Sequence, residues 1–157
     1  MVVKVENLVK IYKNGVKALD NLTFQVRDGE IIGLLGPNGS GKTTCINCIL
    51  SLLKYNQGVI EVFNEPMKAT SYHLKKDIGI ITQFVAVFEE LTVYENIDYF
   101  CGLYIKNKTK RKKLVEEAID FVSINDFRNF YPKKLSGGLL RRLHIACGIA
   151  HKPKLII

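Results

Sequence analysis

Long apolar runs are absent from this sequence. No stretch approaches the roughly 20 apolar residues that a membrane-spanning helix requires, and the first residues do not combine a basic head with an apolar run. These absences exclude a spanning helix and a secretory leader within the residues given. The chain is therefore expected to be soluble and intracellular.

Cysteine is also scarce, and its spacing excludes a disulfide framework. Four cysteines are scattered over 157 residues, and only Cys45 and Cys48 have the C-x-x-C spacing. No second ligand pair accompanies them, which disfavours zinc binding and redox chemistry. The spacing places both thiols near each other on one helix, so we expect reduced cysteines packed in a core.

Acidic residues are fewer than basic ones, 15 against 23, which gives a net charge of +8. An excess of this sign suits an anionic partner such as nucleic acid, a nucleotide or a membrane surface. Much of the excess lies in one run that precedes Glu116, Glu117 and Asp120, a pattern typical of an exposed helix. No aromatic residue is interleaved with the run, which disfavours a nucleic-acid surface. The run comprises Lys106, Lys108, Lys110, Arg111, Lys112 and Lys113.

Alternating and continuous apolar patterns predict several strands. Residues 2–12 and 18–27 alternate loosely between apolar and polar side chains, as half-buried strands do, and turns are expected at Asn14-Gly15 and Asp28-Gly29. Residues 31–35 are continuously apolar, which predicts a short central parallel strand buried on both faces. Further strands are expected over 59–63, 78–82 and 155–157.

Helical spacing of apolar residues predicts helices over 44–53 and 110–122. Thr92 and Glu95 have the form of a capping box, so a helix is expected to run from there to about residue 104. Ser136 precedes another helical pattern that ends near residue 150. Strands interleaved with helices of this length predict a parallel α/β core, with an antiparallel N-terminal sheet and a helical middle section.

Residues 36–43 fit the phosphate-binding pattern G-x-x-x-x-G-K-[ST] between a predicted strand and a predicted helix. Glycines let the backbone wrap around phosphate oxygens, and N–H groups converge at the positive end of the helix. Lys42 supplies a cation for the β and γ phosphates, and the Thr43 hydroxyl suits Mg²⁺. A chance glycine-rich turn is disfavoured because every fixed position matches. The predicted nucleotide-binding residues are Gly36, Pro37, Asn38, Gly39, Ser40, Gly41, Lys42, Thr43 and Thr44.

A phosphate loop alone could belong to a kinase, a GTPase, a helicase or a transporter ATPase. Residues 135–142 read Leu-Ser-Gly-Gly-Leu-Leu-Arg-Arg, and this segment resembles the LSGG signature of ABC ATPases. The resemblance implies that Leu135, Ser136, Gly137 and Gly138 meet the γ-phosphate of ATP held by a partner subunit. Alternatively, the segment is only a helix N-cap after a turn and has no binding role.

The same resemblance assigns roles to two further residues. Tyr12 lies where an aromatic residue stacks on adenine in the family, and Gln83 matches the catalytic glutamine that approaches Mg²⁺ and the attacking water. Mg²⁺ is then expected at Thr43 and Gln83. Taken alone, Tyr12 fits simple packing and Gln83 fits a solvated side chain. Residues 91–96 are similar to the segment that contacts the membrane domain in the family.

The resemblance implies an α/β P-loop NTPase core with an antiparallel N-terminal β subdomain and a helical signature subdomain, incomplete at its C-terminus. The expected division is a β subdomain and phosphate-loop core over 1–83, a helical subdomain over 84–150 and the start of the Walker B strand over 151–157. In the family that strand runs into a metal-binding Asp, a general-base Glu and, later, a switch histidine. These residues are absent here, so this chain alone is expected to bind nucleotide better than it hydrolyses it.

The histidines all precede that strand and are given no catalytic role. His73, His144 and His151 are expected at the surface or on helix flanks. An exposed sheet edge and an exposed apolar face are also expected, because the predicted parallel sheet lacks neighbouring strands.

The predicted function is that of an ATP-binding subunit that energises an ABC transporter. Two such domains, as a homo- or heterodimer, sandwich two MgATP and drive transmembrane permease subunits at the cytoplasmic face of the cell membrane. Arg141-Arg142 after the signature is similar to the corresponding segment of the family's exporters, and this resemblance implies export of a drug-, lipid- or polysaccharide-like substrate. One alternative is a regulatory module that binds nucleotide without hydrolysis. Another is a soluble ABC ATPase acting on nucleic acid or ribosomes, disfavoured because such proteins usually carry two cassettes; no nucleic acid is expected.

Overall fold

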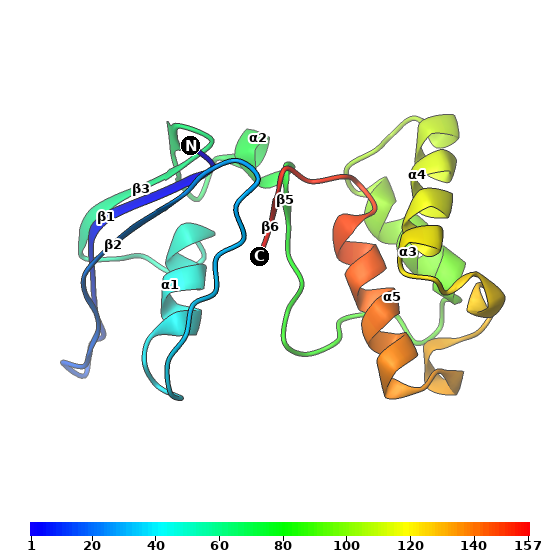
Figure 1. Cartoon of the computed structure of the whole chain (residues 1–157), viewed down its shortest axis with the longest axis horizontal. Coiled ribbons are helices and arrows are strands. Elements are labelled where there is room, and N and C mark those ends of the chain that lie inside the picture. Colours follow the sequence, from blue (N-terminus) through cyan, green and yellow to red (C-terminus); the bar gives the residue numbers. More distant parts are fainter. The chain divides into compact units, whose positions relative to one another are not determined.

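The computed structural model describes residues 1–157, and the chain forms two compact units (Figure 1). The first unit spans Met1–Lys75 and the second spans Lys76–Ile157. Each unit has buried hydrophobic residues of its own, so each is described by itself.

The first unit is built on an antiparallel sheet in the order β2-β1-β3-β4. The central strand β1 pairs with both β2 and β3, and it buries Val3, Val5 and Leu8 against the rest of the unit. Ile60 and Val62 of β3 are buried at alternate positions, as the period of two requires. The strands are β1 (Val3–Ile11), β2 (Lys17–Val26), β3 (Gln57–Val62) and β4 (Glu65–Pro66). The predicted N-terminal strands and their antiparallel pairing are confirmed.

Two helices complete the first unit, α1 (Lys42–Ile49) and the single turn α2 (Tyr72–Lys75). Helix α1 packs on β2 and β3 and buries Cys45 and Cys48. Both cysteines are free thiols, as predicted, and burial raises the pKa of Cys45 to about 11. A thiol in this state is a poor nucleophile and metal ligand, so the pair serves packing.

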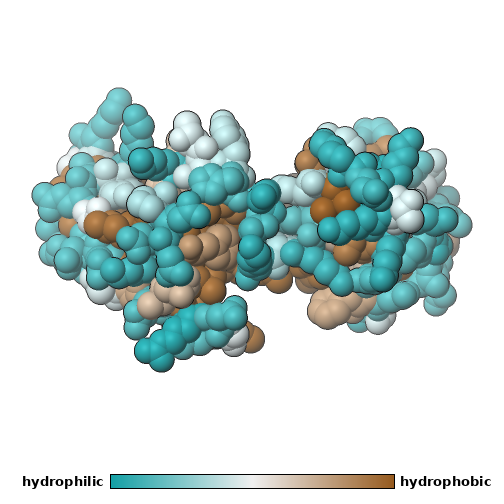
Figure 2. Space-filling view, turned by 90° about the horizontal axis from the view of Figure 1, so that it is seen from above, coloured by the Kyte–Doolittle hydropathy of each residue, from teal (hydrophilic) through white to brown (hydrophobic).

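The prediction of a buried strand over residues 31–35 is wrong. This segment has no strand conformation, and three of its four apolar side chains are exposed, fully at Ile31 and 94% at Leu35, while Leu34 is half-buried. The sheet of this unit contains only β1 to β4, so the segment has no ladder partner among residues 1–157. Figure 2 shows a mostly hydrophilic surface interrupted by apolar patches. An apolar run indicates a surface that favours burial, but it cannot supply the neighbours that would bury it.

The second unit is mainly helical, with a short parallel strand pair. Strand β5 (Ile78–Gly79) pairs with β6 (Leu155–Ile156), so the predicted strand over 78–82 is shorter than expected. This pair is the only parallel pairing in the described residues 1–157. The helices are α3 (Val93–Gly102), α4 (Lys108–Phe121) and α5 (Gly137–Ile149), with short 3₁₀ turns η1 (Asn125–Phe127) and η2 (Pro132–Lys134).

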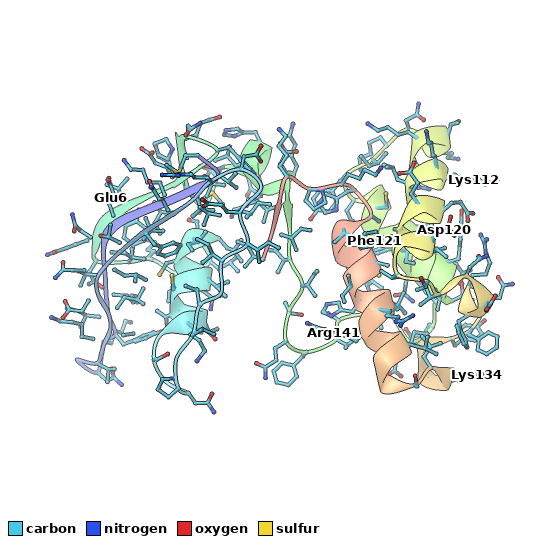
Figure 3. The ribbon with its side chains drawn as sticks, viewed as in Figure 1. Glu6, Lys112, Asp120, Phe121, Lys134 and Arg141 are labelled. Atoms are coloured by element: carbon cyan, nitrogen blue, oxygen red, sulfur yellow. The ribbon has the colours of Figure 1, made fainter.

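Helices α3, α4 and α5 pack against one another around a common core. Ile97 of α3, Ile119 of α4 and Leu143 of α5 are completely buried in it. The lysines of α4 lie on its outer face, where Figure 3 labels Lys112, so the predicted exposed basic helix is confirmed. Thr92 and Glu95 form the predicted capping box at the start of α3. The helix predictions are therefore confirmed to within a few residues.

Asn96 fixes the turn that leads into α3. Its side chain is fully buried, and its Oδ1 accepts a hydrogen bond of 2.8 Å from the Phe88 N–H. The side-chain amide donates to the carbonyls of Phe88 and Leu91, each at 2.9 Å. Removal of this side chain would leave several buried backbone groups without partners.

Replacing Asn96 with alanine is therefore expected to lower the free energy of unfolding of this unit by about 3 kcal/mol. Asn107→Ala is the matched control, because Asn107 is an exposed cap that accepts one hydrogen bond from Lys110 N–H. That control is expected to cost about 1 kcal/mol. Amide hydrogen exchange of α3 to α5 in the intact protein measures both, and equal losses would contradict the role given to Asn96.

Candidate functional site

The predicted phosphate loop is a tight turn that closes on the first residue of α1. The Lys42 ammonium donates to the Gly36 carbonyl at 2.7 Å and to the Pro37 carbonyl at 2.8 Å. Within the loop, the Ser40 N–H donates to the Pro37 carbonyl at 3.2 Å. The lysine is thus held at the centre of the loop, with its cation beside the start of the helix.

Two glycines allow this closure. Gly41 caps α1 with φ of 92°, and a Cβ at this position would lie 2.4 Å from the Ala18 carbonyl oxygen. At Gly36, a Cβ would lie 2.6 Å from the Ser40 hydroxyl. A side chain at position 41 would collide with the backbone of β2, whereas one at position 36 would force the Ser40 side chain to move. The predicted requirement for glycine therefore has a steric cause in the fold.

The start of α1 is open to an anion. No side chain caps it, and its first turn contains no acidic residue. The loop residues 36–40 and Thr43 are exposed. Free N–H groups at the positive end of a helix attract anions, and the Lys42 ammonium adds a full positive charge. The geometry of the loop therefore suits phosphate groups.

Tyr12 lies beside this helix, at the end of β1. Its hydroxyl is 3.1 Å from the Thr44 hydroxyl, and its ring is 39% exposed. The Lys10 ammonium lies 5.2 Å from the ring centroid and donates to the Lys54 carbonyl at 2.7 Å. The sequence analysis missed Lys10, which lies near the end of β1, two residues before Tyr12.

The predicted signature segment begins α5 in the second unit. Ser136 is the N-cap, and its hydroxyl accepts a long hydrogen bond of 3.4 Å from the Leu139 N–H. Gly137 and Gly138 are exposed, and a Cβ on either would meet nothing within 4 Å. Leu135 packs against the helical core and anchors the turn. The first residues of α5 are thus exposed, and no side chain covers the peptide groups of the two glycines.

Gln83 also lies in the second unit, after β5, and its side chain is exposed. The carbonyls of Thr82 and Gln83 both accept from Arg141 of α5, at 2.6 and 3.4 Å. The predicted site residues therefore form two groups. Tyr12 lies together with residues 36–44 in the first unit, and Gln83 lies together with α5 in the second.

The expectation of surface or helix-flank histidines is wrong for His144, whereas His151 does flank α5, directly after its C-cap Ala150, although it is buried. His144 is 4% exposed and His151 is 9% exposed, whereas His73 is exposed and 2.9 Å from Glu65. His144 occupies the inner face of α5, and the His151 ring stacks on Tyr104 at 4.0 Å between centroids. Burial lowers the pKa of both histidines, and the Arg141 guanidinium lowers the pKa of His144 further.

These two histidines predict a dependence of stability on pH. Their pKa lies below 6.5 in the folded protein, so the unfolded chain takes up the proton first as the pH falls. The contribution of these histidines to the free energy of unfolding is expected to be fully present above pH 6.5. Below that pH the free energy of unfolding is expected to decrease, by up to about 1.4 kcal/mol per pH unit for each histidine. Denaturation of wild type and His144→Asn at several pH values measures the slope. A variant slope equal to that of wild type would contradict this prediction.

Comparison with known proteins identifies the family. A family model described as ABC transporter matches residues 19–157. The chain belongs to the ABC transporter family. The resemblance drawn from the phosphate loop and the LSGG segment is thereby confirmed.

Several curated ABC transporter proteins are similar to this chain. ABC transporter A family member 11 of Dictyostelium discoideum is 39% identical, over 92% of this chain and 18% of its own length. The Nod factor export ATP-binding protein I of Sinorhizobium fredii is 32% identical over 99% of this chain and 45% of its own. The methionine import ATP-binding protein MetN of Helicobacter pylori is 34% identical over 100% of this chain and 49% of its own. The chain thus spans less than half the length of each of these relatives.

Solved structures of ABC proteins share the fold. cbiO1 from Clostridium perfringens, part of the ABC transporter complex cbiONQ, matches 99% of this chain and 63% of its own, with a TM-score of 0.90 and 27% identity. A dimeric ATP-binding cassette in a post-hydrolysis state, bound to ADP and phosphate, matches 99% of this chain and 72% of its own, with a TM-score of 0.84 and 30% identity. The predicted α/β P-loop NTPase fold is therefore confirmed. None of the helices of this chain is both long enough and apolar enough to cross a bilayer.

Proposed function

We propose that this chain binds MgATP at residues 36–44 and provides the ATP-binding part of an ATPase that powers an ABC transporter. The observation that carries the proposal is the Lys42 ammonium, held by the carbonyls of Gly36 and Pro37 beside the uncapped start of α1. The β and γ phosphates bind to the loop N–H groups and to Lys42. The cassette bound to ADP and phosphate supports this assignment by its similarity.

The adenine base stacks on Tyr12 in this proposal. The ring is partly exposed, and its hydroxyl is anchored to Thr44 of α1, so the ring lies close to the phosphate loop. The Lys10 ammonium lies over the ring and adds a positive charge to this region. Tyr12, Lys10 and α1 therefore form one surface for a nucleotide.

Mg²⁺ fits the oxygen donors that this chain offers. The Thr43 hydroxyl lies in the first turn of α1 and has no hydrogen-bond partner within the described residues 1–157. The same is true of the Gln83 side-chain amide. Hydroxyl and amide oxygens are suitable ligands for this hard cation. Mg²⁺ would neutralise charge on the phosphates, and Thr43 and Gln83 would each supply it with one oxygen ligand.

We assign Leu135, Ser136, Gly137 and Gly138 to ATP held by a second ATP-binding domain. The exposed start of α5 and its two open glycines suit an anion brought by another subunit. The dimeric relative supports this arrangement. We propose a functional division into a β subdomain and phosphate-loop core over 1–83, a helical subdomain over 84–150 and the start of a Walker B strand over 151–157; its first boundary lies eight residues after the boundary of the compact units at Lys75 and Lys76.

The remaining partners are transmembrane permease subunits, which place the chain at the inner face of the cell membrane. The similar protein cbiO1 is part of an ABC transporter complex, which supports the proposal that this chain also works within such a complex. The Arg141-Arg142 pair supports export of a drug-, lipid- or polysaccharide-like substrate. The named relatives include one exporter and one importer, so transport into or out of vesicles containing the intact complex decides the direction.

Nucleotide titration of the intact protein tests the proposal. Saturable binding of ATP and ADP in the presence of Mg²⁺ is expected, with much weaker binding of AMP, which lacks the phosphates that the loop recognises. Release of phosphate from ATP is expected from the intact dimer. Binding without phosphate release would favour a regulatory module, and absence of ATP binding would overturn the proposal.

A further inference from the structure

A polar contact joins the signature helix α5 to the segment that carries Gln83. Arg141 Nη1 donates to the Thr82 carbonyl at 2.6 Å and lies 3.4 Å from the Gln83 carbonyl. Figure 3 shows the Arg141 side chain extending from α5 towards the segment between β5 and α3. Hydrogen bonds from a guanidinium group are charge-assisted and therefore comparatively strong. This contact therefore restrains the successive carbonyl groups of Thr82 and Gln83.

His144 continues the contact into a directed chain of hydrogen bonds. Its Nδ1 lies 3.2 Å from Arg141 Nη1, and a guanidinium can only donate, so Nδ1 accepts. The ring hydrogen then lies on Nε2, which is 3.5 Å from the Thr82 hydroxyl. That hydroxyl donates to the Phe84 carbonyl at 2.6 Å. The residues from Thr82 to Phe84 are thus restrained on both sides of Gln83.

The backbones also approach closely next to this chain. A Cβ on Gly148 of α5 would lie 2.8 Å from Ile81 and 3.1 Å from the Ile80 carbonyl. A Cβ on Gly79 would lie 2.5 Å from the Gly148 carbonyl. Side chains at these positions would separate α5 from the strand that leads to Gln83. Close packing and these hydrogen bonds therefore hold α5 and residues 79–84 together as one rigid part of the second unit.

We propose that Arg141 and His144 are positioning residues that set the place of Gln83 relative to the start of α5. The inference rests on the proposed function, in which Gln83 approaches the metal and Ser136 meets ATP of the partner domain. Arg141 lies five residues after Ser136 on the same helix. A displacement of α5 caused by ligand at Ser136 therefore carries the backbone of Gln83 with it. Neither Arg141 nor His144 needs to touch nucleotide for this role.

Steady-state ATP hydrolysis by the intact protein, with the partner subunits that copurify with it, tests this inference. Arg141→Ala is expected to lower kcat by about 10- to 100-fold, the effect of misplacing a water-orienting group. The KM for ATP is expected to stay within about twofold, because the phosphate loop and Tyr12 are unchanged. Arg141→Lys retains a donor for the Thr82 carbonyl and is expected to recover part of the lost kcat.

Arg142→Ala is the matched control. Arg142 carries the same charge on the same helix, but its Nη1 lies 3.4 Å from the Val122 and Ser123 carbonyls, away from Gln83. Its kcat is expected to remain close to that of wild type. His144→Asn offers an acceptor near the place of Nδ1, but its side chain is too short to put a donor at the place of Nε2 beside Thr82, so an intermediate kcat is expected.

The outcomes separate the two claims. Equal kcat for Arg141→Ala and Arg142→Ala, or a loss that lysine does not relieve, would overturn the positioning role. A rise in KM without a fall in kcat would also overturn it, since that pattern indicates lost nucleotide binding. Amide hydrogen exchange of α3 to α5 in each variant shows whether the second unit, which carries the substitutions, is still folded. A wild-type protein that binds ATP without hydrolysing it would instead overturn the proposed ATPase function, and this inference with it.

Discussion

Replacing Lys42 with alanine is expected to lower the affinity for MgATP by about 100-fold or more and to abolish hydrolysis. The ammonium makes charge-assisted hydrogen bonds, each of about 1.5 to 3 kcal/mol when the partner is charged. In the free protein it is held by the Gly36 and Pro37 carbonyls, so its position is already set before nucleotide binds. The substitution removes the positive charge at the start of α1 and the two hydrogen bonds that close the loop.

Lys17→Ala is a suitable control for Lys42→Ala. Lys17 belongs to the same unit and carries the same charge, but it pairs with Asp20 at 3.3 Å on an exposed strand. An exposed pair of this kind contributes little to stability, so the control is expected to bind MgATP as wild type does. Isothermal titration of both variants gives the comparison. Unchanged affinity in Lys42→Ala would exclude the phosphate loop as the nucleotide site.

The features that sequence predicted well are those whose chemistry is local. The phosphate loop, the Thr92 to Glu95 capping box and the Ser136 cap depend on residues only a few positions apart. Their hydrogen bonds join residues between three and six positions apart, so residue type and spacing determine them. The antiparallel strand pair β1 and β2 belongs to the same class, because a short turn joins its strands.

The features that sequence missed depend on contacts between distant parts of the chain. Arg141 and His144 meet Thr82, which lies 59 and 62 residues away along the chain. Nothing in the spacing of these residues shows that they meet. The apolar run over residues 31–35 failed for a related reason, since burial requires strands that pair with it. The exposed lysines of α4 were predicted correctly, because a helix face in contact with water needs no partner from elsewhere in the chain.

His144 shows why a residue type alone does not give a role. Spacing after the LSGG segment placed it on α5 but did not show which face it occupies. In the fold it is buried, and burial together with Arg141 lowers its pKa. The neutral ring can accept from Arg141 and donate towards Thr82, whereas a protonated ring could only donate. The buried environment therefore selects the form that the polar chain requires.

Gly41→Ala is expected to lower the free energy of unfolding of the first unit by about 4 kcal/mol, the sum of backbone strain and overpacking. The strain comes from φ of 92°, which a residue with a Cβ rarely adopts. The overpacking comes from the Ala18 carbonyl oxygen, 2.4 Å from the new Cβ, and from the Leu19 side chain at 3.0 Å. Neither neighbour can retreat easily, because both belong to β2, which is paired with β1.

Gly15→Ala separates these two contributions. Gly15 has φ of 83° in the turn between β1 and β2, and a Cβ there would meet nothing within 4 Å. The control therefore carries the strain without the collision and is expected to cost about 1 kcal/mol. Amide hydrogen exchange of β1 and α1 in the intact protein reports the opening of this unit. A similar loss in both variants would show that backbone strain alone accounts for glycine at position 41. A much larger loss in Gly41→Ala, with weakened ATP binding, would show that contact between the loop and β2 holds the helix start where phosphate binds.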